Sequence, residues 1–217
     1  MNNSNASRAI LSIMQLYSYA CLSLFGSFIL PLLFEPLKAG GSAILNNLVT
    51  FELSPLLSTL AYGFVVATLY TFAWNFLLGA GLQILSGLFG LEIPKIILIG
   101  RAALIGFIYG ATSENIARTL KYDITNYTIL AIVVLTEFFA YSIATYGGVR
   151  IGKILVTPHD GTISQKILDV LKGPAISTYR NTWGKLKTEM RETLRLCPLI
   201  AMLLLFSATL EIWLVIS

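Results

Sequence analysis

Charged residues are scarce in this chain, and their scarcity restricts what the protein can be. Lys, Arg, Asp and Glu make up 12% of the 217 residues, about half the share found in an average soluble domain. Hydrophobic residues make up 56%, and the mean hydropathy is +0.76. A soluble fold of this size has too little interior to bury so many apolar side chains. The composition therefore excludes a soluble enzyme and a disordered chain, and it indicates an integral membrane protein.

Histidine and cysteine are almost absent, which removes most metal and disulfide chemistry. The chain has one histidine, His159, and two cysteines, Cys21 and Cys197, both within apolar runs. Most zinc and iron sites use several histidine or cysteine ligands, so such sites are not expected. We interpret both cysteines as buried, unreactive thiols. Signatures of nucleotide, serine-hydrolase and zinc-protease sites are also missing, and we expect no enzyme activity, no metal and no cofactor.

Long apolar runs predict an all-α fold, a polytopic bundle of transmembrane helices that forms one domain over 1–217. The runs that fit a single span cover approximately 10–34, 96–111, 127–149 and 196–216. The first run is longer than the core of a signal peptide, and no small-residue cleavage site follows it. We therefore interpret it as a span that is retained in the protein.

The apolar stretch 55–90 is too long for one straight span. As a single helix it would measure about 54 Å, against a hydrocarbon core of about 30 Å. Break points are supplied by Trp74, Asn75, Gly79, Gly81, Gly87 and Gly90. We predict a span over 55–72, followed by a shorter helix or re-entrant piece to Gly90. The chain has six spans if that second piece crosses the membrane and five if it does not.

Basic residues predict the orientation of the chain. The segment 150–195 carries nine Lys or Arg and four acidic residues, which makes it the most basic loop. The positive-inside rule places this loop in the cytoplasm. Five spans then leave Arg8 inside as well, whereas six spans would put it outside. We therefore predict a multi-pass protein of the cell membrane with five spans, its N-terminus in the cytoplasm and its C-terminus outside.

The basic loop is expected to contain two helices. Residues 162–171 form a short one, which Gly173 and Pro174 end. Between 176 and 194, apolar residues recur at spacings of three and four with basic residues between them, which predicts an amphipathic helix before the last span. This helix is either an interfacial anchor or a docking surface for a cytoplasmic partner. The candidate contact residues on it are Arg180, Trp183, Lys187 and Arg191.

Two acidic residues stand inside apolar spans, where ionised groups are costly and usually mark function or tight pairing. Glu137 lies in the middle of its span, and Glu211 lies in the last one. We predict an intramembrane polar cluster of Asn75, Glu137 and Glu211, with Arg101 or Arg150 as the basic partner. The simpler role for Glu137 is to lock helix packing, and the alternative is a role in ion or proton passage.

Small residues recur every four positions in three of the spans, a pattern that lets helix backbones approach closely. The rows are Gly106 and Gly110; Ala140, Ala144, Gly148 and Gly152; and Gly63, Ala67, Thr71, Asn75, Gly79, Gln83 and Gly87. On a straight helix a four-residue repeat drifts by about 40° per step, so a break near Asn75 would reset the third row. The rows fit packing within the chain or between copies.

Several segments, taken in order, resemble the stage II sporulation protein M family of polytopic membrane proteins. They are ILNNLVTF, WNFLLGAGL, TEFFAYSIATYGGVRIG and FSATLEIW, and the resemblance runs from about Ile44 to the C-terminus. The positions that match the family's elements are Asn46 and Asn47; Asn75, Gly79 and Ala80; Glu137, Ala140, Gly148, Arg150 and Gly152; and Glu211. The family often has histidine where Val133 stands and proline where Phe139 stands, so this chain lacks a His–Glu pair.

The resemblance implies a membrane scaffold that organises partner proteins and has no catalytic activity. Its expected partners are the lipid bilayer and other membrane proteins, in a homo- or hetero-oligomer, and no nucleic acid. The segment Gly40-Gly41-Ser42 is expected to form a turn, with Asn46 and Asn47 beyond it as a second partner surface at the outer interface. The alternative is a transport or channel subunit with a polar site around Glu137 and Asn75, working as an oligomer or with a partner ATPase.

Overall fold

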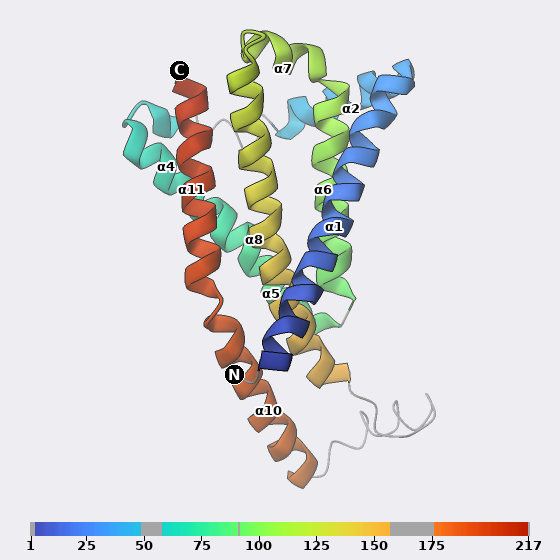
Figure 1. Ribbon diagram of the computed structural model, residues 1–217, viewed down its shortest axis with the longest axis vertical. Helices are drawn as coiled ribbons and strands as arrows, with labels where there is room; N and C mark the ends of the chain where they lie inside the picture. The colour runs from blue at the N-terminus through green and yellow to red at the C-terminus, as the bar shows by residue number, and fades with distance from the viewer. Residues whose placement is uncertain (1–2, 49–57, 91, 157–175, 217) are drawn as a thin grey trace.

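The computed structural model is a bundle of helices (Figure 1). It describes residues 3–48, 58–90, 92–156 and 176–216, and these contain no β-strand. The elements are α1 (Asn3–Leu33), α2 (Glu35–Leu48), α4 (Phe64–Trp74), the π-helix η2 (Asn75–Gly81), α5 (Leu82–Ser86), the 3-10 helix η3 (Gly87–Phe89), α6 (Ile93–Ala111), α7 (Ser113–Thr119), α8 (Ile124–Val156), α10 (Ile176–Leu194) and α11 (Cys197–Ile216). The helix predicted over 162–171 lies outside the described residues.

Five helical segments are long and apolar enough to cross a membrane, which confirms the predicted five-span helical bundle. They are Ala6–Leu33, Phe64–Phe89, Ile93–Ala111, Ile124–Ile154 and Trp183–Ile216. Large apolar side chains on them point outward, among them Leu22, Val65 and Met202, as expected for helices whose outer face meets lipid. The segments alternate in direction, so that the N-terminus and the C-terminus lie at opposite ends of the bundle (Figure 1).

The second span is one continuous helical segment of 26 residues, Phe64–Phe89. It begins after Gly63, whose φ of 101° favours glycine. The interruption expected near Asn75 is the π-helix η2, a widened turn, and the chain continues helically through it rather than separating after Phe72. At 1.5 Å per residue the segment measures about 39 Å, more than a core of about 30 Å. It accordingly crosses the bundle obliquely (Figure 1).

The π-helix explains how the four-residue row of the second span stays on one face. A π turn closes its hydrogen bonds between residues five apart, so it rotates the chain less per residue than an α turn. This opposes the drift of about 40° per four residues that an α-helix accumulates. Members of the row from both sides of η2 are therefore buried together, namely Ala67, Thr71, Asn75, Gly79, Gln83 and Gly87.

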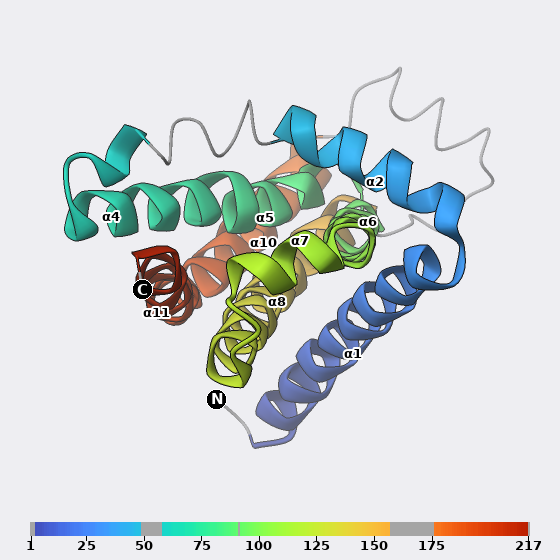
Figure 2. The same ribbon diagram turned by 90° about the horizontal axis from the view of Figure 1, so that it is seen from above.

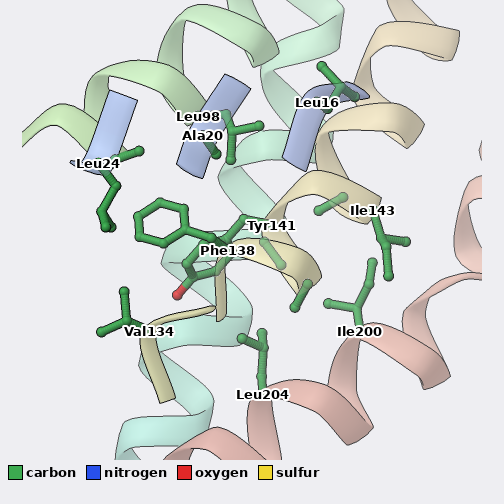
Figure 3. Packing of buried hydrophobic residues seen from close by; sticks show 14 residues of the cluster. Leu16, Ala20, Leu24, Leu98, Val134, Phe138, Tyr141, Ile143, Ile200 and Leu204 are labelled. Carbon is green, nitrogen blue, oxygen red and sulfur yellow. The ribbon is translucent and has the colours of Figure 1, made fainter. Parts of the chain in front are cut away.

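The helix α8 lies at the centre of the bundle, with α1 and α11 on opposite sides of it (Figure 2). Its buried Phe138, Tyr141 and Ile143 meet apolar residues of the surrounding helices (Figure 3). Those neighbours include Leu16 and Ala20 of α1, Leu98 of α6, and Ile200 and Leu204 of α11. The core is therefore built around one helix that touches most of the others, which explains why α8 has no single polar face.

The glycines of α6 allow its backbone to touch that of α1. A Cβ atom on Gly106 would lie 2.1 Å from the carbonyl oxygen of Leu24, and one on Gly110 would lie 2.1 Å from that of Phe28. Such distances exclude any side chain without a backbone shift. Gly106 and Gly110 are thus used for packing within this chain.

The small residues of α8 also face neighbours in the same chain. A Cβ on Gly148 would lie 2.4 Å from the carbonyl oxygen of Gln83, and the facing Gly87 approaches the Gly148 carbonyl in turn. Ala140 and Ala144 are fully buried in the core, and Gly152 is buried as well. The contact of Gly148 with Gln83 and Gly87 therefore packs the second span against α8.

The turn predicted at Gly40-Gly41-Ser42 is wrong, because these residues lie inside α2. Glu35 and Pro36 begin this helix, and proline in a first turn suits a helix start. Gly41 faces α6, where an added Cβ would overlap the Cβ of Ala111 at 2.1 Å. The glycine is therefore a packing residue, and α2 lies with α7 at the end of the bundle opposite α10 (Figure 1).

Candidate functional site

Glu137 of α8 is held by residues of two other spans. The Nδ2 atom of Asn75, the first residue of η2, donates a hydrogen bond to Glu137 Oε1 over 2.8 Å. The hydroxyl of Ser207, on α11, lies 3.2 Å from the same Oε1 and 3.2 Å from the carbonyl oxygen of Val133. One carboxylate oxygen therefore links three spans.

Arg101 of α6 brings a positive charge to this group. Its Nη2 atom donates to the hydroxyl of Tyr141 over 3.2 Å, and its Cζ atom lies 4.4 Å from the centre of the Tyr141 ring. The guanidinium is also close enough to act electrostatically on Glu137. A Cβ on Gly79 would lie 2.5 Å from the Tyr141 ring, so this glycine makes room for the ring on which Arg101 rests.

Glu211 belongs to the same region. Its carboxyl group, on α11, is close enough to Glu137 for their charges to interact, and Tyr109 of α6 lies within electrostatic range of both. The structure therefore brings together four of the five predicted residues, Asn75, Arg101, Glu137 and Glu211. With Ser207 we call these residues the polar cluster, and they come from four of the five spans.

Arg150, the other basic candidate, does not join the polar cluster. It follows Glu137 by 13 positions on the same helix, which separates the two along α8 by about 20 Å. Its guanidinium pairs with Glu189 of α10 and lies 5.7 Å from the ring centre of Tyr146. Arg150 therefore fastens α10 to the end of α8, and Arg101 is the basic residue of the cluster.

Two contributing residues were missed by the sequence reasoning, although the spacing contains a signal for each. Tyr141 lies four positions after Glu137, and Ser207 lies four positions before Glu211. Residues four apart share a helix face, so both belong beside the acidic residue of their own span. A search for polar neighbours at that spacing would have found them.

Further polar groups lie on the buried face of the second span. Gln83 accepts a hydrogen bond from the Thr145 hydroxyl over 3.1 Å. Within the part of the chain that the structure describes, Gln83 Nε2 and the hydroxyls of Thr68 and Thr71 are buried and have no hydrogen-bond partner. The polar face therefore extends in both directions from Asn75.

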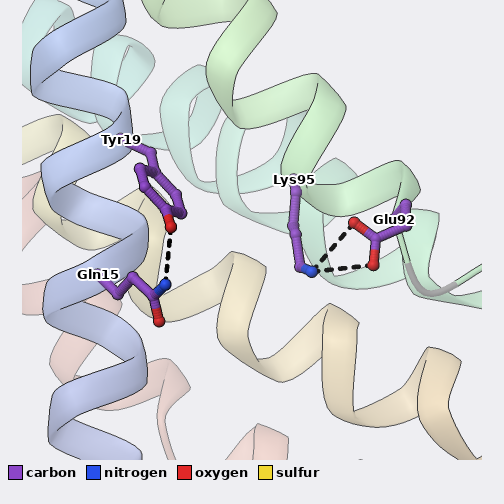
Figure 4. A network of polar contacts seen from close by, with 4 residues as sticks. All are labelled: Gln15, Tyr19, Glu92 and Lys95. Atoms are coloured by element: carbon purple, nitrogen blue, oxygen red, sulfur yellow. Dashed lines mark hydrogen bonds and ion pairs between the residues drawn. The ribbon is translucent and has the colours of Figure 1, made fainter.

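Polar contacts at the surface are of a different kind. Gln15 donates to the Tyr19 hydroxyl over 2.7 Å, and Lys95 meets both carboxylate oxygens of Glu92 at 2.9 and 3.0 Å (Figure 4). Both pairs are exposed, and each joins residues three or four positions apart. Exposed pairs of this type contribute little to stability. Polar contacts that join different helices occur in the polar cluster and at a few other places, such as the bond from the Ser23 hydroxyl to the Ile99 carbonyl oxygen.

The predicted amphipathic helix coincides with α10, and its apolar face is only partly covered. Leu186 is buried, whereas Trp183 remains 58% exposed. Lys187 and Arg191 are exposed, and they lie on either side of Glu189, on the part of α10 that runs beside α8. The beginning of α10 extends beyond the bundle (Figure 1). Arg180 lies in the first part of α10, and Asn46 and Asn47 lie in the last turn of α2; the structure describes only the backbone of these three residues.

Among the described residues, no three His, Cys, Asp or Glu side chains lie close enough to hold a metal ion. The fold and the cluster define a polytopic α-helical membrane protein with a polar centre. No family model, no curated protein and no solved structure matches the chain. The function is therefore argued from the site itself.

Proposed function

We propose that this protein is a non-catalytic scaffold of the cell membrane that assembles with other membrane proteins. One observation carries the proposal: the polar cluster ties four spans to one another, while α10, whose beginning extends beyond the bundle, has exposed basic and aromatic side chains. A bundle fixed in this way is suited to presenting a surface. The resemblance of its sequence elements to the stage II sporulation protein M family supports the same role.

The charges at the two ends of the bundle support a cytoplasmic position for α10. The end that carries α2 and α7 has balanced charges among its described residues, namely Lys38, Arg118 and Lys121 with Glu35, Glu114 and Asp123. The opposite end holds Arg8, Arg150, Lys153 and the basic residues of α10, with fewer acids. The positive-inside rule then favours a cytoplasmic N-terminus and an external C-terminus.

Purification from the native membrane tests the scaffold proposal. The tagged protein is extracted in a mild detergent, and co-purifying proteins are quantified by mass spectrometry. We expect at least one partner in stoichiometric amount, lost when Lys185, Lys187 and Arg191 are all replaced by Glu. The matched control replaces Lys38, Arg118 and Lys121 at the other end by Glu and should keep the partner. Recovery of nothing except copies of this chain would contradict the proposal.

A transport or channel subunit is the second candidate, and the buried face of the second span favours it. Asn75 begins a π-helix, a feature that often occurs at functional sites. Near it in sequence, the hydroxyls of Thr68 and Thr71 have no hydrogen-bond partner among the described residues. Purified protein in liposomes would then show an ion or proton flux that Glu137→Gln abolishes. The exposed Glu114→Gln serves as the control. Absence of flux from the wild-type protein would leave this candidate without support.

A further inference from the structure

A pocket opens at the basic end of the bundle, away from the polar cluster. It has a volume of about 490 Å³ and lies between the first turns of α1, the last turns of α8 and the middle of α10. Arg8 of α1, Arg150 and Lys153 of α8, and Glu189 of α10 line its polar part. Three basic side chains from two helices therefore converge on one concave surface.

The charges of the pocket are not balanced within the described residues. Arg150 pairs with Glu189, which cancels one positive charge against the single acid of the pocket. Arg8 and Lys153 form no ion pair with any residue that the structure describes, and both are exposed. Counted over the described residues that line it, the pocket keeps a net positive charge of two, which suits an anion such as a phosphate group.

The pocket also has an apolar part. Leu11 of α1 and Tyr146 of α8 line it, and each lies closer to the middle of its span than the basic residues do. Arg8 stands near the start of the segment Ala6–Leu33, and Lys153 stands at the end of Ile124–Ile154, so the basic residues belong at the membrane boundary. An anionic phospholipid has this same order, with a phosphate at the boundary and apolar chains below it.

We propose that this pocket binds the headgroup of an anionic phospholipid, with the phosphate against Arg8 and Lys153 and the start of the acyl chains against Leu11 and Tyr146. Basic pockets between transmembrane helices are known to hold anionic headgroups. Arg150 and Glu189 form the wall of the pocket, because their ion pair joins α8 to α10. A bound lipid would thus contact three helices and cover the joint between the bundle and α10.

Native mass spectrometry of the purified full chain tests this proposal by counting bound lipids. Phosphatidylglycerol, phosphatidylcholine and inorganic phosphate are titrated separately into the detergent-solubilised protein. The double variant Arg8→Gln, Lys153→Gln removes the unpaired charges. The matched control is Lys38→Gln, Arg118→Gln, which removes two exposed basic residues from the opposite end. Circular dichroism and gel filtration verify that every variant is folded before lipid is added.

We expect one phosphatidylglycerol to bind preferentially over phosphatidylcholine, and the double variant to bind it roughly 25-fold more weakly, at about fivefold per basic residue. The control should bind it as the wild type does. Equal weakening in the control, or equal binding of phosphatidylcholine, would overturn the proposal. Inorganic phosphate that binds as tightly as phosphatidylglycerol would overturn the assignment to a lipid.

Discussion

Gly106 and Gly100 are two glycines on one helix, and their surroundings predict opposite effects of the same substitution. A Cβ on Gly106 meets the Leu24 carbonyl oxygen and the Ser27 hydroxyl, whereas a Cβ on Gly100 meets nothing within 4 Å. We expect Gly106→Ala to lower the free energy of unfolding by about 1–3 kcal/mol through overpacking. Gly100→Ala should leave it unchanged or raise it by up to about 1 kcal/mol. Thermal unfolding in detergent measures both, and equal effects would refute the close contact of α6 with α1.

We predict that the hydrogen bond between Asn75 and Glu137 contributes to the free energy of unfolding by joining the second span to α8. Asn75→Ala, Glu137→Ala and the double variant form a cycle whose non-additive part isolates this contact. Hydrogen bonds between transmembrane helices give about 0.6 kcal/mol on average and about 1.7 kcal/mol at most, and we expect a value in that range. A cycle of Thr209→Ala with Glu137→Ala is the control, because among the described residues the Thr209 hydroxyl donates to the Leu205 carbonyl oxygen of its own helix and not to Glu137. If the effects of Asn75→Ala and Glu137→Ala on the free energy of unfolding are strictly additive, this hydrogen bond does not stabilise the packing of the two spans.

The polar cluster was largely predictable because a carboxylate in an apolar run is costly and therefore conspicuous. Glu137 and Glu211 were identified in that way. Arg150 could have been excluded from the sequence, since it follows Glu137 by 13 positions on one helix, a separation of about 20 Å. That Arg101 reaches the cluster was not predictable, because it depends on which turn of α6 faces which turn of α8. The contact of Arg101 with Tyr141 of α8 shows which turns face each other.

At the scale of the element, η2 sets which residues of the following segment face α8. As a widened turn, η2 already accommodates one residue more than an α turn would. Inserting a further Ala after Leu78, an exposed residue within η2, should therefore rotate the following residues by about 100°. Gln83 and Gly87 would then leave the α8 interface. We expect the insertion to lower the melting temperature far more than Leu78→Ala does, because that control keeps the number of residues. An insertion variant as stable as the control would show that the contact of Gln83 and Gly87 with α8 is dispensable.

Helices with a regular spacing of apolar residues were predicted well. Helices whose sequence is explained by contact with another helix were not. The spacing of apolar residues gave α10 its bounds, since one face of that helix repeats regularly. For α2, Gly40 and Gly41 suggested a turn, but the contact of Gly41 with Ala111 makes glycine necessary inside the helix. The sequence predicted only a break near Asn75. It shows that the four-residue row of the second span would drift around an α-helix, but it does not show that a π turn compensates for the drift.

At the scale of the whole molecule, the alternation of five spans predicts which residues share a side of the membrane. In a background with Cys21→Ala and Cys197→Ala, single cysteines replace Arg8, Arg118 or Lys187. An impermeant maleimide on intact cells should label Arg118→Cys, whereas Arg8→Cys and Lys187→Cys should react only after permeabilisation. Labelling of Arg8→Cys from outside would indicate six spans, so the experiment separates the two arrangements.

Hydropathy restricted the number of spans to five or six, because the bilayer sets the length that an apolar helix must have. The distribution of basic residues then favoured five. The order in which the helices pack could not be obtained in this way. The central place of α8 and the pairing of α1 with α6 depend on contacts between distant segments, such as Gly106 and Gly110 against the backbone of Leu24 and Phe28. A single sequence does not reveal which segment faces which.

The pairing of α1 with α6 also has a consequence for biosynthesis. The first span makes backbone contact with the third, so the surface around Leu24 and Phe28 has no partner until Gly106 and Gly110 have been synthesised. At about 5–20 residues per second, the ribosome needs several seconds to cover that interval. During this delay, lipid or the translocation machinery occupies the place on α1 that α6 later takes. The nascent chain therefore completes its first helix pair only after a second span has already entered the membrane.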